Sequence, residues 1–569
     1  MMLLLLCACT ADKDVAVLPD DTGYAHVDTS VVPDSGDTAT TDTTESVPDS
    51  DTDTSGDTGP PAPTWVALDV YPGDIVVGPD ATFQARAVGT RSDGTRGDAD
   101  VAWVSDDEDI AAVDAEGLVL ALEPGVGRVT ATVDGLSASF SFEVDDSYEA
   151  EVTVLDAVTG LPIPDARVAL PSTNGQRTDA TGYARLPVPD GMAIDFSVWV
   201  DNTYDAVSFL QVVNRRYTVY LWPIDTDATD ATLHGVVDFS GVDDAAWDEL
   251  VLGLSAPATP VLATMRLDDW FSDERVVTVF GFDTDLPSNL VLEGEAEDYF
   301  VRTGAGPSGS WVLAGPLKVS DVSAATGSTG DALRLLIDHL DVMRWGWAGG
   351  ATTTLNSTTE LGLAPASTFD HATVVAVPEL PTGFTGAEDV LVMTAEDRDG
   401  EGYYITGFAL SAGDAVSVPH VDPAGVTDSR GTAVVAYAQA GGLGGTGGTS
   451  VASGTVDALG NGSVAAFLDL PVISSWDPAT RAMAVTTDGD ADFVHVLLTD
   501  SHHLRHHLYV GDAWSGTVPN TLADFGRATA VIDVETVATA DDTFEARCGR
   551  GQLDVRAMPA VAASHTRQE

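Results

Sequence analysis

The chain has 569 residues, and 89 Asp or Glu against 25 Lys or Arg give it a formal net charge of −64. This excess excludes a general nucleic-acid partner, because affinity for a duplex depends on basic side chains that neutralise phosphates. It also disfavours docking on anionic lipid through a basic patch. The three cysteines, Cys7, Cys9 and Cys548, cannot build a disulfide framework or a cysteine zinc site.

The first residues, MMLLLLCACTADKD, are apolar from Met1 to Ala8 and then become acidic. This apolar run is too short to cross a bilayer, which takes about 20 residues. Its end, LCAC at Leu6–Cys9, resembles the lipobox of bacterial lipoproteins: an aliphatic residue, a free position, a small residue and a cysteine. The resemblance implies that residues 1–9 are a lipoprotein signal segment, that Cys9 is lipidated, and that the membrane is a partner through this lipid.

A signal peptide normally carries a basic region before its apolar run, and here only the α-amino group is basic. We therefore expect the natural start to lie upstream of Met1, the alternative being a chance run of leucines. Thr10 follows the cysteine at the position where Asp would imply retention at the inner membrane. This favours a lipid-anchored envelope protein at the outer membrane of a Gram-negative bacterium.

Residues 10–63 are rich in Asp, Thr, Ser, Gly and Pro and almost free of large apolar side chains. Such a segment buries too little surface to offset its ordering entropy, so we expect a disordered linker. Repulsion between its carboxylates extends it, which would hold the folded parts away from the membrane.

The segment 64–146 alternates apolar and polar residues over several short stretches, for example at Phe83 and Ala85 and at Phe140 and Phe142. Period two with one apolar face is typical of half-buried antiparallel strands. The sequences SDGTRGD, DAEG, EPGVG and VDG supply turns between them. About seven strands in this length predict a β-sandwich.

The order of these stretches resembles the bacterial Ig-like group 2 family (BIG2). Trp103 with Ser105, Gly117 and the turn at Pro124–Gly127 fall where that family has them. The resemblance implies a sandwich of the kind found in surface proteins and adhesins, with no catalytic residues. It also makes Trp103 a core residue.

Residues 147–225 contain EVTVLDAVTGLPIPDARVAL, TDATGYARLPVPDG and the closing strand YTVYLWP. They resemble the carboxypeptidase regulatory-like domain, which implies a small prealbumin-like β-sandwich in which Gly182 takes a positive φ. Peptidases with such a domain place catalysis in a separate zinc domain with a His-x-x-Glu signature. No histidine of this chain has Glu three residues later, so peptidase activity is not expected.

The remainder shows no family resemblance but continues with strand-like alternation, which predicts two β-rich domains at 229–360 and 361–569. A helix is expected near 331–345, with Asp331 as its N-cap and with a buried stripe of Leu333, Leu336, Leu340 and Met343. The Gly-rich stretch Gly441–Ser450 lacks the Lys-Ser/Thr ending of a phosphate loop and is interpreted as a flexible connection.

Two groups of residues are candidate metal ligands. Asp397, Asp399 and Glu401 alternate around Gly400, an oxygen-rich spacing that calcium favours, although the twelfth position of an EF-hand would be Phe408. The alternative is the tip of a hairpin between VLVMTAE and YYITGFAL, because Asp-Gly suits such turns.

The second group is SHHLRHHLYV, with His502, His503, His506 and His507, which on a helix could chelate a transition metal. The surrounding alternation favours a strand instead. On a strand, His506 shares one face with the leucines and His507 shares the other face with Arg505.

The fold class is therefore mainly β: an Ig-like and a prealbumin-like sandwich in tandem, then a β-rich C-terminal half with one short helix. No catalytic motif is present, so we expect a non-enzymatic surface or envelope protein that binds a surface protein or glycan, with calcium as the one cofactor suggested. An exported hydrolase with its site in 229–569 and a passive envelope spacer are the alternatives.

Overall fold

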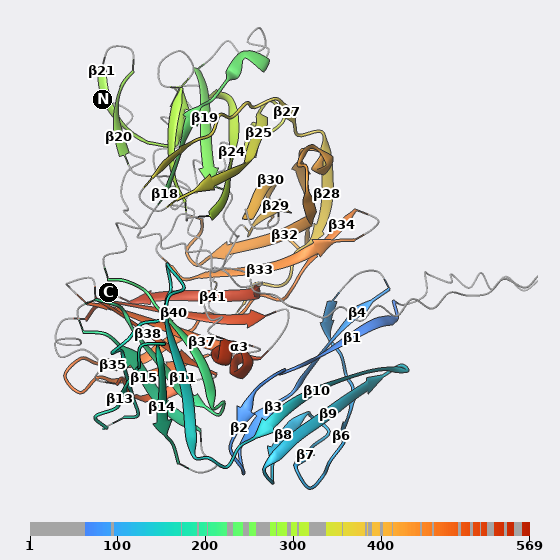
Figure 1. The fold of residues 1–569 in the computed structure, drawn as a ribbon. Coiled ribbons are helices and arrows are strands. Elements are labelled where there is room, and N and C mark those ends of the chain that lie inside the picture. The colour runs from blue at the N-terminus through green and yellow to red at the C-terminus, as the bar shows by residue number, and fades with distance from the viewer. Residues whose placement is uncertain are drawn as a thin grey trace, which may run out of the picture.

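The structure, a computed structural model, describes residues 63–568 with internal gaps, the longest of which are 225–230, 243–249, 258–273, 318–336, 385–389, 520–528 and 551–559. Almost all of its elements are β-strands, which confirms the predicted mainly β fold (Figure 1). Cys9, the predicted lipidation site, and residues 10–62 of the predicted linker lie outside the described residues.

The first module packs three small sheets, with orders β1-β4-β5, β2-β10-β9-β6 and β3-β8-β7, around two adjoining apolar clusters. The alternation found in the sequence places Phe83, Phe140 and Phe142 inside, with the rings of Phe83 and Phe142 5.0 Å apart. The strands are β1 (Trp65–Tyr71), β2 (Val76–Val77), β3 (Thr82–Gln84), β4 (Arg86–Arg91), β5 (Arg96–Asp98), β6 (Ala102–Ser105), β7 (Ala111–Val113), β8 (Leu118–Ala121), β9 (Gly125–Val133) and β10 (Leu136–Val144).

Trp103 lies at the border of two apolar clusters of this module and is partly buried rather than enclosed. Its indole covers Gly117, where a Cβ atom would lie 2.8 Å from the indole Nε1. Gly117 also has a φ of +84°, a backbone conformation that glycine adopts without steric cost. The glycine therefore meets two requirements at once, a left-handed turn and space for the tryptophan.

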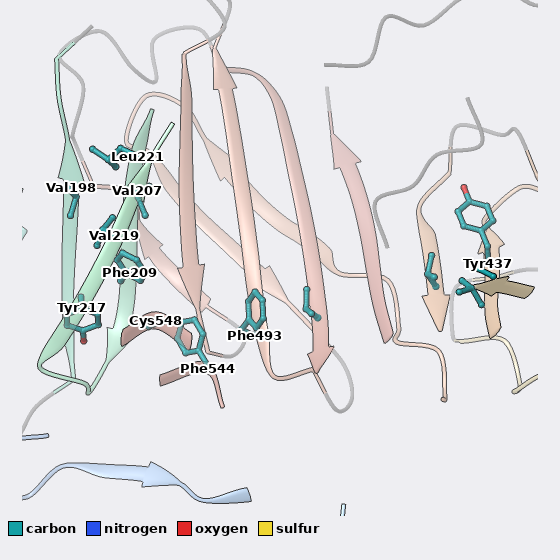
Figure 2. Packing of buried hydrophobic residues seen from close by; sticks show 14 of the residues in the cluster. Val198, Val207, Phe209, Tyr217, Val219, Leu221, Tyr437, Phe493, Phe544 and Cys548 are labelled. Atoms are coloured by element: carbon teal, nitrogen blue, oxygen red, sulfur yellow. The ribbon is translucent and has the colours of Figure 1, made fainter. Parts of the chain in front are cut away.

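The second module is a two-layer sandwich, as expected. One layer has the order β14-β11-β17 and the other begins β13-β12-β15-β16, with Phe196, Phe209 and Tyr217 packed between them (Figure 2). Gly182 has the expected positive φ, +75°. The strands are β11 (Glu149–Asp156), β12 (Arg167–Ala169), β13 (Gln176–Arg177), β14 (Tyr183–Pro187), β15 (Ile194–Trp199), β16 (Ala206–Val212) and β17 (Arg216–Leu221).

This second layer does not end at β16. β16 pairs in parallel with β38, from Ala206 opposite His506 to Leu210 opposite Val510. The pairing extends the layer into a 15-stranded sheet, β13-β12-β15-β16-β38-β37-β40-β41-β33-β32-β29-β30-β31-β28-β34. A strand about three hundred residues later in the chain therefore pairs with the second module. The second module and the later strands share one sheet and are not separate domains in sequence order.

Strands of residues 231–368 form separate sheets with the orders β23-β18-β26, β22-β19-β24-β25-β27 and β20-β21. They are green and yellow in Figure 1. The strands are β18 (Ala231–Val236), β19 (Leu250–Pro257), β20 (Glu274–Val279), β21 (Phe282–Pro287), β22 (Leu290–Leu292), β23 (Asp298–Thr303), β24 (Gly306–Leu317), β25 (Arg344–Thr353), β26 (Thr358–Glu360) and β27 (Ser367–Thr368).

The helix predicted near 331–345 is only partly within the described residues, since 331–336 lie outside them. Its C-terminal end is wrong: helical backbone stops at Asp338 and β25 begins at Arg344. Pairing of β25 with β24 outweighs the local helical pattern there. Leu340 and Met343, from the predicted stripe, are nevertheless buried.

Seven strands from residues 371–464 form a closed ring, because β34 pairs with both β28 and β33. The Gly-rich stretch joins β32 to β33 and so is a hairpin connection. The strands are β28 (His371–Ala376), β29 (Val390–Arg398), β30 (Gly402–Ser411), β31 (Ala415–His420), β32 (Ser429–Gln439), β33 (Thr449–Val456) and β34 (Asn461–Val464).

The last part packs the small sheet β35-β36-β39 on one face of β37, β38 and β40 through a cluster that includes Val485, Val496, Leu508 and Trp514. The apolar sequence SVAAFLDLPVI, residues 463–473, is strand only at its two ends. The elements are β35 (Val472–Asp477), β36 (Ala482–Thr486), β37 (Phe493–Asp500), β38 (Arg505–Val510), β39 (Trp514–Thr517), β40 (Thr529–Thr539), α3 (Phe544–Arg550) and β41 (Ala560–Gln568).

Candidate functional site: an acid–histidine array at the β16–β38 seam

Acidic, basic and histidine side chains gather at the seam, the place where β16 pairs with β38. Strand alternation gives β38 two different faces, since His506 points into the cluster beneath β36 while Arg505 and His507 point to the other side. Register then places Tyr509 opposite His495 of β37, and His495 opposite Glu535 of β40. Polar side chains of β37, β38 and β40 therefore meet on one face of the sheet, next to Asp205, which directly precedes β16.

These side chains lie in a row between two carboxylates, joined by one 3.8 Å ion-pair contact and two hydrogen bonds. Asp205 and Arg505 form an ion pair with 2.9 Å between Oδ2 and Nε, and Asp205 is completely buried. Nε2 of His507 lies 3.8 Å from the same oxygen. Nδ1 of His507 is 3.1 Å from Nε2 of His495, whose Nδ1 is 3.0 Å from Oε2 of Glu535. The order is Asp205, His507, His495, Glu535.

The two imidazole planes differ by only 8°, so a hydrogen bond between the facing nitrogens is well aligned. Such a bond needs one donor and one acceptor. If neutral His495 donates through Nδ1 to Glu535, its Nε2 accepts, and His507 donates through Nδ1. The facing nitrogens therefore fit one hydrogen bond between the two rings.

His506, on the opposite face of β38, belongs to a second polar chain. Its Nε2 is 2.8 Å from Oγ of Ser208, which is 2.6 Å from Oγ of Ser197. Ser208 and His506 have no exposed surface. A serine beside a histidine is the pattern of an activated nucleophile, but a substrate cannot reach this pair, so its role is structural.

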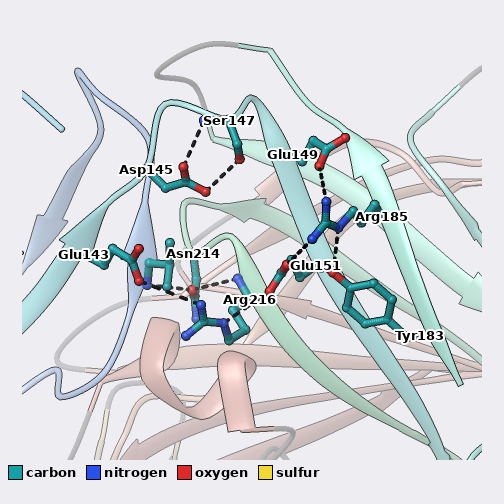
Figure 3. Close-up of polar contacts among 10 residues, drawn as sticks. Glu143, Asp145, Ser147, Glu149, Glu151, Tyr183, Arg185, Asn214 and Arg216 are labelled. Atoms are coloured by element: carbon teal, nitrogen blue, oxygen red, sulfur yellow. Dashed lines mark hydrogen bonds and ion pairs between the residues drawn. The ribbon is translucent and has the colours of Figure 1, made fainter. Parts of the chain in front are cut away.

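A second polar centre joins the first module to the rest of the protein (Figure 3). Asn214, between β16 and β17, accepts through Oδ1 from the backbone N–H groups of Val76 and Arg216, at 3.2 and 3.1 Å. Its Nδ2 donates to the carbonyl of Glu545 in α3, at 3.1 Å. One buried amide therefore connects β2, the second module and the C-terminal helix.

Helix α3 completes this junction from the other side, and Figure 1 shows it between the first module and the body. The carboxylate of Glu545 accepts from the backbone N–H groups of Val213 and Asn214, both at 3.0 Å. Burial raises the pKa of this carboxyl to about 7. Ala546 and Val213 pack into the core of the first module. The ring of Phe544 lies 5.8 Å from that of Phe493 (Figure 2).

Next to this junction lies an exposed network of ion pairs, also drawn in Figure 3. Arg185 contacts Glu149 and Glu151, and Arg216 contacts Glu151 and Glu143. Exposed pairs of this kind contribute little to stability. A more enclosed contact is made by Arg86 of β4, whose Nη1 is 3.1 Å from Oδ2 of Asp492.

Only one of the three predicted calcium ligands lies among the described residues. Asp397 lies on β29, whereas Asp399 and Glu401 lie outside the described residues. Arg398 pairs with Gly402 across the hairpin, in agreement with the hairpin alternative. Among the residues that the structure does describe, no group of three or more His, Cys, Asp or Glu side chains is arranged to hold a metal ion. Calcium binding remains a prediction.

For the histidine tract, the structure confirms the strand interpretation at the residues that it describes, 504–510. His506 and His507 lie on β38 and point to opposite faces, so these two do not converge on one ion. His502 and His503 lie outside the described residues. Metal binding by the tract also remains a prediction.

Sequence reasoning missed Asp205, His495 and Glu535. Two of them carried a signal, because a histidine in DFVHVLLTD and a glutamate in AVIDVET interrupt otherwise apolar strands. A polar residue at an inward position of a buried strand needs a partner. Nothing in the sequence shows which partner, since the pairing joins strands far apart along the chain.

Comparison with protein families assigns the first module. Residues 67–144 match the bacterial Ig-like domain (group 2). These residues form an Ig-like domain of that group, as the sequence resemblance implied. No curated protein matches the chain.

Among solved structures, domains 5–6 of the S-layer protein SbsC show 11% identity, cover 44% of this chain and 91% of their own, and have a TM-score of 0.14. The Bacillus anthracis TIE protein shows 8% identity, covers 72% and 74%, and has a TM-score of 0.13. Likenesses this weak carry no argument about function. Within the described residues, no helix is long and apolar enough to cross a membrane.

Proposed function

We propose that the protein is a non-catalytic component of the bacterial surface or envelope, anchored by lipid at Cys9 and binding a surface protein or glycan through its β-sandwich modules. The observation that carries this proposal is the bacterial Ig-like domain at residues 67–144. The LCAC sequence and the acidic linker that follows it support the anchor.

The architecture is consistent with a binding scaffold. The acid–histidine array connects side chains of neighbouring strands. Asp205, at one end of the array, has no exposed surface. Asn214 and α3 fix the Ig-like domain to the body, which presents its outer strands in a defined orientation. We further propose that residues 147–225 are a carboxypeptidase regulatory-like domain, on the two-layer sandwich seen there.

The anchor is tested by replacing one cysteine at a time in the full chain, expressed in a Gram-negative host. Cys9→Ala should release the protein from the membrane fraction, because lipid chains supply the anchoring energy. Cys7→Ala is the matched control and should leave the protein in the membrane. Membrane retention of the Cys9→Ala chain would contradict the proposal.

A further inference from the structure

Three polar side chains lie in a row where β41 enters the 15-stranded sheet. β41 pairs with β40 on one side and with β33 on the other, and β33 pairs with β32. In this register Thr449 of β33 is directly opposite both Gln439 of β32 and His565 of β41. Directly opposite residues of antiparallel strands project from the same face, with their Cβ atoms about 4.5–5.5 Å apart. A carboxamide, a hydroxyl and an imidazole are therefore neighbours across three strands.

The carboxamide and the hydroxyl of this row are both buried. Gln439 is 4% exposed and Thr449 is 3% exposed. The next pair on the same face of these two strands, Tyr437 opposite Val451, belongs to the hydrophobic cluster that the second module shares with the later strands. Burial keeps away water, which would otherwise compete with the Thr449 hydroxyl for the carbonyl carbon of Gln439.

The side-chain carbonyl of Gln439 has a hydrogen-bond donor beside it. The hydroxyl of Tyr437, a residue without exposed surface, donates to Oε1 of Gln439 at 3.4 Å. When a nucleophile adds to the carbonyl carbon, negative charge develops on this oxygen, and a donor placed there stabilises it. Gln439 is therefore suited to act as an electrophile, with Tyr437 as the group that supports its oxyanion.

His565 is oriented by a carboxylate on its other side. Its Nε2 lies 3.0 Å from Oδ1 of Asp533 in β40. An ionised carboxylate can only accept, so a neutral ring donates through Nε2 and carries its lone pair on Nδ1. This is the tautomer of a general base, and its nearest partner across the β33–β41 ladder is Thr449. Nucleophile, base and orienting acid are thus present together, as activation of a hydroxyl requires.

We propose that Thr449 and Gln439 form an intramolecular ester bond that links β33 to β32. Oγ1 of Thr449 attacks Cδ of Gln439 while the hydroxyl proton passes to His565. The Cδ–Nε2 bond of Gln439 then breaks, and the same proton goes to the departing nitrogen, so that one molecule of ammonia leaves. The balance needs no oxidant, reductant or further reactant. The reaction happens once in each chain, and the inference does not depend on the proposed surface function.

Peptide mass spectrometry of the denatured full chain tests the proposal. Chymotrypsin cuts after Leu443, between the two residues, and in the wild-type chain the resulting peptides should stay joined, with a mass lower by one ammonia. Mild alkaline hydrolysis, which cleaves esters faster than amides, should separate them and leave a glutamate in place of Gln439. Two separate peptides with unmodified Gln439 would overturn the proposal.

The joined peptides, and not the mass loss alone, are the decisive result. Asn461 precedes Gly462 in the same region, and such a pair also loses ammonia when it forms a succinimide. A succinimide lies within one peptide and cannot join two. Loss of ammonia located at Asn461, with the two peptides separate, would therefore count against the ester.

Substitutions at two adjacent positions identify the nucleophile. Thr449→Val removes the hydroxyl at nearly constant volume and should abolish the link, whereas Thr449→Ser keeps a hydroxyl and should retain it. Ser450→Ala is the matched control, because the Ser450 hydroxyl lies on the opposite face of β33 and donates to the carbonyl of Leu468. This variant should be linked like the wild type. A link that persists in Thr449→Val would overturn the assignment.

The role of His565 is tested by the rate of ester formation. In chains made by cell-free synthesis and sampled at intervals, His565→Gln should form the link about 100-fold more slowly than the wild type, because glutamine keeps a polar side chain but is no base. An unchanged rate would overturn the role of His565 as the base. The peptide measurement on the wild-type chain decides whether the ester exists even if a variant does not fold.

Discussion

Two glycines of the Ig-like domain adopt almost the same left-handed backbone but differ in their surroundings. Gly117 and Gly135 have φ values of +84° and +85°. A Cβ atom on Gly117 would lie 2.8 Å from the indole of Trp103, whereas nothing lies within 4 Å of one on Gly135. The pair therefore separates the cost of the backbone conformation from the cost of displacing the tryptophan.

We expect Gly135→Ala to destabilise the domain by about 1 kcal/mol, the cost of a left-handed alanine. Gly117→Ala should cost about 2–4 kcal/mol, because overpacking adds to the same backbone cost. Amide exchange of β9 and β10 in the full chain measures both free energies of opening. Equal losses for the two variants would show that Trp103 does not require the space above Gly117.

Cys548 illustrates how burial removes reactivity at the scale of one residue. The thiol has no exposed surface, and burial raises its pKa well above the usual value. We expect Cys548 to resist alkylation by iodoacetamide at pH 8 in the folded chain and to react fully in denaturant, as judged by peptide mass spectrometry. Fast labelling of the native protein would contradict the packing of α3 described above.

At the scale of elements, the Asn214 amide is one of the contacts that attach the Ig-like domain to the body. Asn214→Ala removes the acceptor of two backbone N–H groups and the donor to the Glu545 carbonyl. Leaving one such group unsatisfied costs about 1–3 kcal/mol, so for the three groups together we expect a loss of about 3 kcal/mol or more. Calorimetry should show the Ig-like domain unfolding in a separate transition at lower temperature.

Asn461→Ala is the control for that experiment, since the Asn461 side chain is exposed and its amide donates to the neighbouring Asp457 of the same turn. Its calorimetric profile should match that of the wild type. If Asn214→Ala also gave the wild-type profile, the Ig-like domain would be held by contacts other than this junction.

How far the sequence could predict these elements depends on the range of the interactions involved. Strands such as β29 and β30 have local alternation, and the hairpin between VLVMTAE and YYITGFAL lies where the sequence predicts it. Helix α3 is seven residues long and carries no clear periodic signal. The seam contact of Ser208 with His506 spans 298 residues, so no local pattern could identify it. The fold class was therefore predictable, but the site was not.

At the scale of the whole molecule, the sequence suggested domains arranged along the chain. The structure instead has one sheet that includes strands from the second module, the closed ring and the last part of the chain. Strand pairs between such distant segments form only after long loops have closed, so their formation is expected to be slow. The shared sheet makes the body behave as one unit, to which the Ig-like domain is attached at Asn214 and Arg86.

The shared sheet also predicts which strands a substitution in one strand would destabilise. A Pro in the middle of β38, as in Leu508→Pro, removes a backbone donor from the seam and should destabilise both the second module and the strands β37 and β40. The same substitution in the small sheet, Ala484→Pro in β36, should affect mainly β35, β36 and β39. Limited proteolysis followed by mass spectrometry would show whether cleavage extends into residues 147–225 only in the first case.

The central claim is that this chain works outside the cytoplasm, held by lipid at Cys9. The most direct test is the mass of the mature protein isolated from the membrane fraction of cells that express the natural gene. We predict a polypeptide that begins at Cys9 and carries acyl chains. A soluble, unacylated chain that retains residues 1–8 would contradict the account.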